Sequence, residues 1–117
     1  MIEVEILNYL KSQNIGGIGE NVHMETPEKE PEEYIRIMRT GGGTSDRMRT
    51  ATFAIQSIGK TKFRSAEINQ KVMKAMEDLN IQNVTECNLN SAYDYTNTSK
   101  KQYRYQSVFT LTYYEED

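Results

Sequence analysis

Residues 27–58 have the sequence PEKEPEEYIRIMRTGGGTSDRMRTATFAIQSI, and the predicted fold is built outward from them. From residue 34 to residue 40 the side chains alternate, with both isoleucines on one face, which predicts a β-strand. Residues 50–58 alternate in the same way and are rich in β-branched and aromatic side chains, which predicts a second strand. The two strands together predict a β-hairpin.

Three consecutive glycines, Gly41 to Gly43, separate the two predicted strands. Glycine loses the most backbone entropy on ordering and has no side chain to pack, so we expect the first strand to end before them. The hairpin is therefore predicted to have a long, flexible tip, and this tip carries Arg47 and Arg49.

Helical periodicity predicts two helices in the chain. Residues 2–13 place apolar side chains at helical spacing before a Gly-Gly pair, and residues 63–79 carry the clearest apolar stripe. Thr61 or Ser65 is suited to cap the second helix, because its hydroxyl oxygen accepts a hydrogen bond from the first turn. Both helices are expected to cover one face of a sheet.

Further alternation predicts the remaining strands. Residues 18–24 predict a short edge strand, and residues 83–95 and 103–113 predict a C-terminal hairpin. One face of the first strand of this hairpin is expected to carry Cys87, Leu89, Ser91, Tyr93 and Tyr95. Residues 1–117 are thus predicted to form a single α+β domain, an antiparallel or mixed sheet of about four to five strands with two helices packed on it.

Composition excludes several classes of function. The 117 residues carry a net charge of -3, which is not the basic footprint of a protein whose main partner is nucleic acid. The single cysteine, Cys87, allows no internal disulfide and no cysteine metal cluster, which is typical of a reducing compartment. No apolar run approaches the ~20 residues of a membrane span, and charged residues interrupt the N-terminal segment, so we expect a cytosolic protein.

Residues 25–33 are the most acidic segment, with five glutamates and one lysine. Pro27 and Pro31 exclude a helix or a central strand there, so the segment is predicted to be an exposed, extended connector. An acidic run is usually a solvated surface, but the self-repulsion of its charges also suggests a role at an interface.

The sequence contains no convincing catalytic or cofactor site. Gly59-Lys60-Thr61 lies between a predicted strand and a predicted helix, as in a phosphate-binding loop, but the position of the first glycine of that motif is taken by Ala54. The only histidine, His23, has no spaced cysteine or histidine partner for metal binding. We therefore predict a protein without catalysis, cofactor or metal.

Several segments resemble small tail terminator, or tail-completion, proteins of long-tailed bacteriophages and prophages. The likeness starts in residues 24–27 and continues through Pro-Glu-Glu-Tyr-Ile-Arg-Ile at residues 31–37, Arg-Thr-Gly-Gly at residues 39–42 and Asp46-Arg47. It extends over the second strand, Thr-Phe-Ala-Ile-Gln-Ser, and the second helix, and so covers about residues 22–79. The triple glycine is longer than the loop of that family, and the C-terminal hairpin matches only in type.

This resemblance implies a structural virion protein of the tail-neck region, assembled in the host cytoplasm. Such a protein forms a ring of its own copies, usually six, on the last ring of the tail tube protein, where it ends polymerisation and offers a joining surface to the head-completion or connector protein. Opposite charges on neighbouring copies then set the register of the ring. The predicted contact residues are Glu28, Glu30, Arg47 and Arg49.

Two other functions are compatible with the sequence. Another phage neck protein, such as a head-completion or connector component, has the same small size and ring symmetry but binds a different partner. A binding module of a different class uses the tyrosines of the C-terminal hairpin, which holds most of the eight tyrosines, to bind a peptide or single-stranded nucleic acid. Cross-strand pairing of half-buried rings is the simpler interpretation of these tyrosines.

Overall fold

The long hairpin of β2 (Tyr34–Ser45) and β3 (Met48–Gly59) forms the centre of the fold, as the alternation predicts. The computed structural model describes residues 1–114, and its remaining elements are α1 (Ile2–Ser12), a 3-10 turn η1 (Ile15–Gly17), β1 (Val22–His23), α2 (Lys62–Glu77), β4 (Val84–Asp94) and β5 (Tyr103–Tyr114). The strand order is β1-β2-β3-β5-β4, and only the pairing of β1 with β2 is parallel. The predicted α+β class, with two helices on a mixed sheet, is confirmed.

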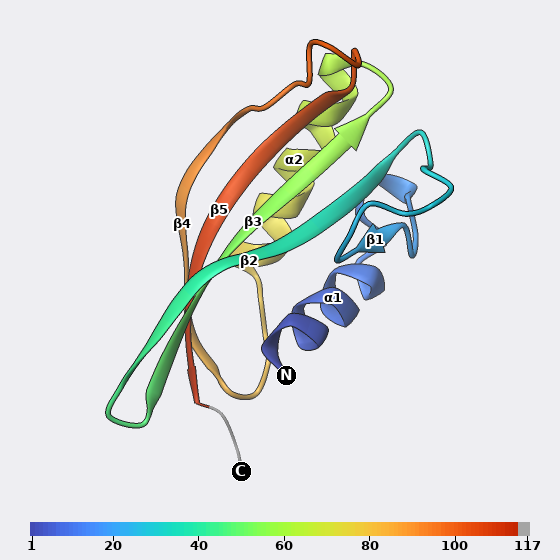
Figure 1. Cartoon of the computed structure of the whole chain (residues 1–117). Helices are drawn as coiled ribbons and strands as arrows, with labels where there is room; N and C mark the ends of the chain where they lie inside the picture. The colour runs from blue at the N-terminus through green and yellow to red at the C-terminus, as the bar shows by residue number, and fades with distance from the viewer. Residues whose placement is uncertain (115–117) are drawn as a thin grey trace.

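Both helices lie on the same face of the twisted sheet, with α2 behind β3 and β5 and α1 on the β1 side (Figure 1). The core fills the space between these layers. Ile6 and Leu10 of α1 and Ile68 of α2 are fully buried against Phe53 and Phe109 of the sheet. Burial of such side chains stabilises the fold by roughly 1.5–3 kcal/mol each.

The first turn of α2 is fixed by two local features. The Thr61 hydroxyl accepts a hydrogen bond of 3.0 Å from the Arg64 backbone N–H, which confirms Thr61 as the N-cap. Gly59 lies two residues before this cap. Only glycine fits there, because a Cβ would lie 2.5 Å from the Ser65 backbone nitrogen. The Gly-Lys-Thr triplet therefore has a structural explanation, in which glycine permits close packing and threonine caps the helix.

The prediction that the first strand ends at the glycines is wrong. Gly41, Gly42 and Gly43 pair with residues 50–52 of β3, because ladder hydrogen bonds use only backbone groups. A Cβ at Gly42 would lie 2.5 Å from the Thr50 carbonyl oxygen, so only glycine fits there. The flexible tip is replaced by a tight turn at residues 46–47, and the hairpin projects beyond the helices (Figure 1).

The C-terminal hairpin has the predicted strands, but the side chains expected on one face of β4 are divided between its two faces. Cys87 pairs with Leu111 and Leu89 with Phe109, which places both on the helix-covered side. A register shift between Leu89 and Ser91 then moves Ser91 to the opposite, open side, where Tyr93 follows it. The expectation of a single face from Cys87 to Tyr95 is therefore wrong, since a bulge breaks period two.

Two element bounds also differ from the sequence-based ranges. The predicted edge strand at residues 18–24 is only the two-residue β1, which does lie at the edge of the sheet. The second helix ends at Glu77 rather than at residue 79, and Leu79 contributes to the partly buried shell of the core from the following loop.

Candidate assembly interface

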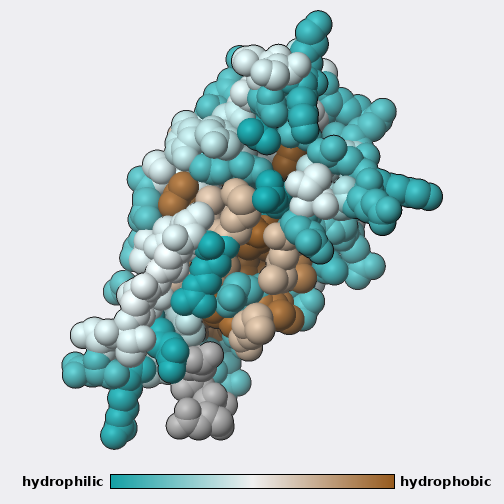
Figure 2. Space-filling model, in the orientation of Figure 1, coloured by the Kyte–Doolittle hydropathy of each residue, from teal (hydrophilic) through white to brown (hydrophobic). Residues whose placement is uncertain are grey.

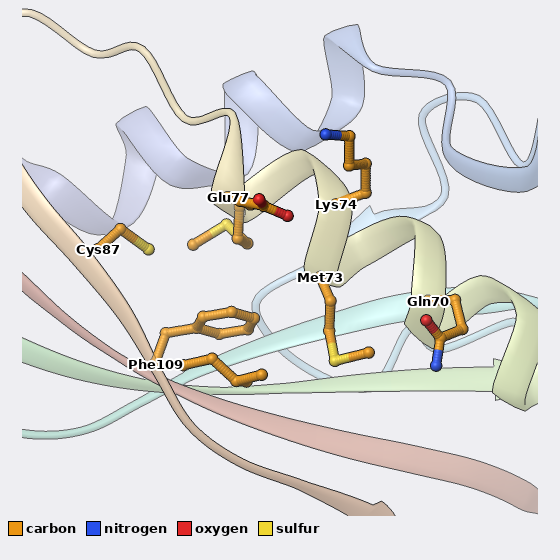
Figure 3. A pocket seen from close by; sticks show the side chains of 8 residues that line it. Gln70, Met73, Lys74, Glu77, Cys87 and Phe109 are labelled. Carbon is orange, nitrogen blue, oxygen red and sulfur yellow. The ribbon is translucent and has the colours of Figure 1, made fainter.

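An open groove of about 440 Å³ lies between α2 and β4. Its lining includes the apolar side chains of Met73, Met76, Leu89 and Phe109. Gln70, Lys74 and Glu77 of α2 also line it. Figure 3 shows Met73 reaching from α2 toward the sheet, Phe109 projecting from the sheet, and Cys87 at one end of the groove. Leu89 is 50% exposed although it points to the helix side of the sheet. The groove therefore suits an apolar side chain of a partner.

Cys87 is the only reactive group of the groove floor and is poorly activated. Burial raises the pKa of the Cys87 thiol to about 11, so almost no thiolate exists at neutral pH. The thiol thus acts as a small apolar surface.

A second, smaller apolar hollow lies on the opposite side of the molecule, beside the outer edge of β2. It has a volume of about 260 Å³ and is lined by Met24, Ile37, Met38 and Phe53, with a polar border at Arg39. Figure 2 shows apolar surface gathered here, between β2 and α1, within a largely hydrophilic face. The two apolar surfaces thus belong to opposite edges of one sheet.

Each of these edges is open in residues 1–114. β4 pairs only with β5, so its outer edge has no strand partner within these residues. β1 covers β2 only at Ile35 and Arg36, which leaves β2 unpaired on its outer side from Ile37 to Ser45. Open strand edges favour pairing with another chain.

The acidic connector is exposed, as predicted, but its charges are partly neutralised within the chain. Glu30 accepts hydrogen bonds from the Tyr34 hydroxyl at 2.6 Å and from Gln102 at 2.5 Å. Burial and this bond to Glu30 raise the pKa of Tyr34 to about 12. Glu32 pairs with Lys60 at 3.1 Å. The expectation that the charges of the acidic connector repel each other along its whole length is therefore wrong, because several of them have partners far away in the sequence.

Arg64 of α2 fixes the end of the connector. Its Nε lies 3.1 Å from both carboxylate oxygens of Glu33, and its other nitrogens contact Glu67 at 2.6 Å and donate to the Gly16 carbonyl. One side chain thus joins the connector, the 3-10 turn and α2. Glu28, in contrast, is exposed and has no hydrogen bond or ion pair to another residue within residues 1–114.

The structure does not bring the four predicted contact residues together in one copy. Glu28 and Glu30 precede β2, whereas Arg47 and Arg49 lie at the far end of the β2–β3 hairpin. Twelve residues of β2 separate the two ends, and the longest dimension of the molecule is 44 Å. A contact between these charges therefore requires a second copy, and its existence stays a prediction.

The tyrosines of the C-terminal hairpin do not form one stripe. Tyr113 is buried on the helix side, while Tyr93 lies on the open side and receives a hydrogen bond of 2.5 Å from Gln106. Tyr95 stacks edge-on with Tyr93 and lies under the Arg104 guanidinium, 4.8 Å from the ring centre. This division between two faces weakens the case for a continuous stacking surface.

The apolar groove and hollow were not predicted. Leu89 in β4, which lines the groove, and Met24, which lines the hollow, are apolar residues that remain exposed, at 50% and 43%. The groove also needs Met73 and Phe109, which are distant in sequence, and this combination follows only from the packing of α2 on the sheet.

Residues 1–114 contain no cluster of three or more histidine, cysteine or acidic side chains arranged to hold a metal ion. No helix within this range is long and apolar enough to cross a membrane. Comparison with known protein families and with curated protein sequences gives no match for this chain.

Proposed function

We propose that this chain is a structural virion protein that forms a ring on the end of a phage tail tube, stops its growth and offers a surface for head joining. The proposal starts from the sequence resemblance described above. The observation that carries it is the pair of open strand edges, β2 on one side of the sheet and β4 on the other. Different edges on opposite sides favour head-to-tail contacts, which form a ring when the rotation from copy to copy closes.

The strand directions are compatible with such a ring. Each step from β2 to β3, to β5 and to β4 is antiparallel, so β4 runs antiparallel to β2. A rotation about an axis parallel to the strands leaves these directions unchanged. β4 of one copy then meets β2 of the next as an antiparallel pair, and the sheet continues from copy to copy. The two register shifts on β4 interrupt regular pairing, so the pairing with β2 of the next copy is restricted to the segments between and beside them.

The two ends of the molecule then face the two sides of the ring. One end carries the projecting hairpin with Arg47 and Arg49, and the other carries the acidic connector with Glu28. Glu30 belongs to the same end but is already bound to Tyr34. In this ring the charges of the two ends lie on opposite faces, so Glu28 and Arg47 of neighbouring copies do not meet. We propose instead that the arginine end and the acidic end contact the tube and the head connector, one each, through charge.

The test is to remove this chain from the phage or prophage that encodes it and to image the particles by electron microscopy. The proposal predicts overlong, headless tubes, and wild-type chain supplied in trans restores normal tails. Replacing Arg47 and Arg49 with glutamine should abolish this rescue. Normal tails in the absence of the chain contradict the proposal, and tails of normal length without heads point to another neck protein instead.

A further inference from the structure

We propose that the groove between α2 and β4 receives the first turn of helix α1 from the next copy in the ring. This inference rests on the proposed ring and names the contact that holds it together. The groove is the place where the helix layer of one copy is incomplete, and α1 lies at the opposite edge of the same layer.

The helix layer is too narrow for the sheet. Strands lie about 4.8 Å apart and packed helices about 8–10 Å apart, so two helices cover about four strands. The outer strand, β4, is covered by α2 only in part, and Leu89 on its inner side is 50% exposed beside Phe109. A third helix fits the free position.

Helix α1 of a neighbour occupies this position when the sheet continues. It lies on the β1 side of β2 in Figure 1, at the edge opposite β4. Val4 in its first turn is 40% exposed, and Met1 at the N-cap is 75% exposed. When β4 of one copy lies beside β2 of the next copy, α1 of the next copy lies beside α2 of the first copy in the helix layer.

The two surfaces also lie at the same level along the strands. Arg39 pairs with Phe53, Phe53 with Phe109, and Phe109 with Leu89, which forms one row across the sheet. Arg39 at the β2 end of this row contacts Glu3 in the first turn of α1 at 3.3 Å. The first turn of α1 and the groove therefore meet without a shift of one copy along the other.

The contact is reciprocal. Leu89 protrudes at the β4 edge, and the apolar hollow of about 260 Å³ lies at the β2 edge near Arg39, on the same row. A neighbour that places its α1 in the groove thus receives Leu89 in its own hollow. Complementary protrusions and pockets of this kind give an interface its specificity.

Charge at this end of the sheet does not set the order of copies. Lys100 and Lys101 are exposed in the turn between β4 and β5, and they line a hollow together with Glu30 and Glu32 of the same copy. The order of copies therefore follows from the apolar contact and from the shared row of residues.

The test introduces opposite charges on the two sides of the contact. The variants are assayed for rescue of particles that lack the native chain. Leu89→Lys and Val4→Glu should each lower the yield of infectious particles at least about tenfold, because each buries a charge opposite an apolar surface. The double variant should recover most of this loss, since the two charges then face each other. Asn88→Lys, on the opposite side of β4, and Ser12→Glu, at the far end of α1, should rescue like wild type.

Outcomes for the contact and for the ring function are separable. If particles without the chain have overlong tubes but the single variants rescue like wild type, the ring function stands and the contact is refuted. Failure of the double variant, with all variants unfolding at wild-type temperature, also refutes it. If particles without the chain have normal tails, sedimentation velocity of the purified variants tests the contact between copies instead. Association of wild type and double variant but not of the singles supports the contact, and monomers throughout refute it.

Discussion

Replacing Arg64 with methionine tests how the acidic connector is held to the body of the protein. Methionine keeps most of the aliphatic stem and removes only the guanidinium. That group contacts both Glu33 oxygens at 3.1 Å, Glu67 at 2.6 Å and the Gly16 carbonyl. The Arg64 side chain is 25% exposed and the Glu33 side chain is 17% exposed, so solvent screens the ion pair between them only in part.

The expected cost follows from these contacts. Two charge pairs and one bond to a carbonyl, each contributing about 1 kcal/mol after a discount for partial exposure, give about 3 kcal/mol. For a chain of this length this corresponds to a decrease in the unfolding temperature of roughly 12 °C. Circular dichroism measures the decrease, and hydrogen exchange of residues 25–33 should rise in the same variant.

Lys60→Met is the matched control. Lys60 pairs with Glu32 at a similar distance, 3.1 Å, but the side chains are 62% and 76% exposed. Such an exposed pair contributes at most about 0.5 kcal/mol, or about 2 °C. If Arg64→Met unfolds within about 2 °C of Lys60→Met, the anchor role of Arg64 is refuted.

Three further predictions concern stability. Gly59→Ala should cost about 2–3 kcal/mol in urea unfolding, because its Cβ would lie 2.5 Å from the Ser65 nitrogen. Gly41→Ala should be neutral, because a Cβ there would meet no atom within 4 Å among residues 1–114 beyond its chain neighbours, and equal costs contradict the packing argument. The folded-state pKa of Tyr34 is about 12 against 10.0 for an ordinary tyrosine, so its contribution is complete below pH 10 and is lost as the pH rises toward 12. Tyr34→Phe should flatten this alkaline decrease, and an unchanged decrease argues against it. Ser57 is fully buried and its hydroxyl has no hydrogen-bond partner within residues 1–114, so Ser57→Ala should leave stability unchanged or raise it by about 1 kcal/mol, and a clear loss of stability contradicts this expectation.

Elements with strong side-chain periodicity were predictable from the sequence. The apolar stripe around Ile68 and the alternation around Phe53 and Phe109 each place one face in the core, and the structure has these faces as predicted. Local chemistry predicted a cap at Thr61 or Ser65, because the N-cap bond joins neighbours in sequence, and the structure has it at Thr61.

Features that depend on the backbone or on distant partners were not predictable. The glycines at positions 41 to 43 continue β2 because β3 supplies their partners, although their missing side chains argue for a loop. The bulge near Asn90 moves the following side chains of β4 to the opposite face of the sheet, and no residue pattern in the sequence indicates it. Arg64 neutralises Glu33 and Lys60 neutralises Glu32, both from remote positions in the sequence, so the run looked more repulsive than it is.

Capping of a growing tube is the property that tests the proposed function most directly. Purified tube protein from the same phage or prophage is allowed to polymerise with increasing amounts of this chain, and the tube lengths are measured by electron microscopy. We predict that tubes become shorter as the chain is added and carry a ring at one end, and that Leu89→Lys weakens both effects. A length distribution that does not change at any ratio of chain to tube protein contradicts the proposal.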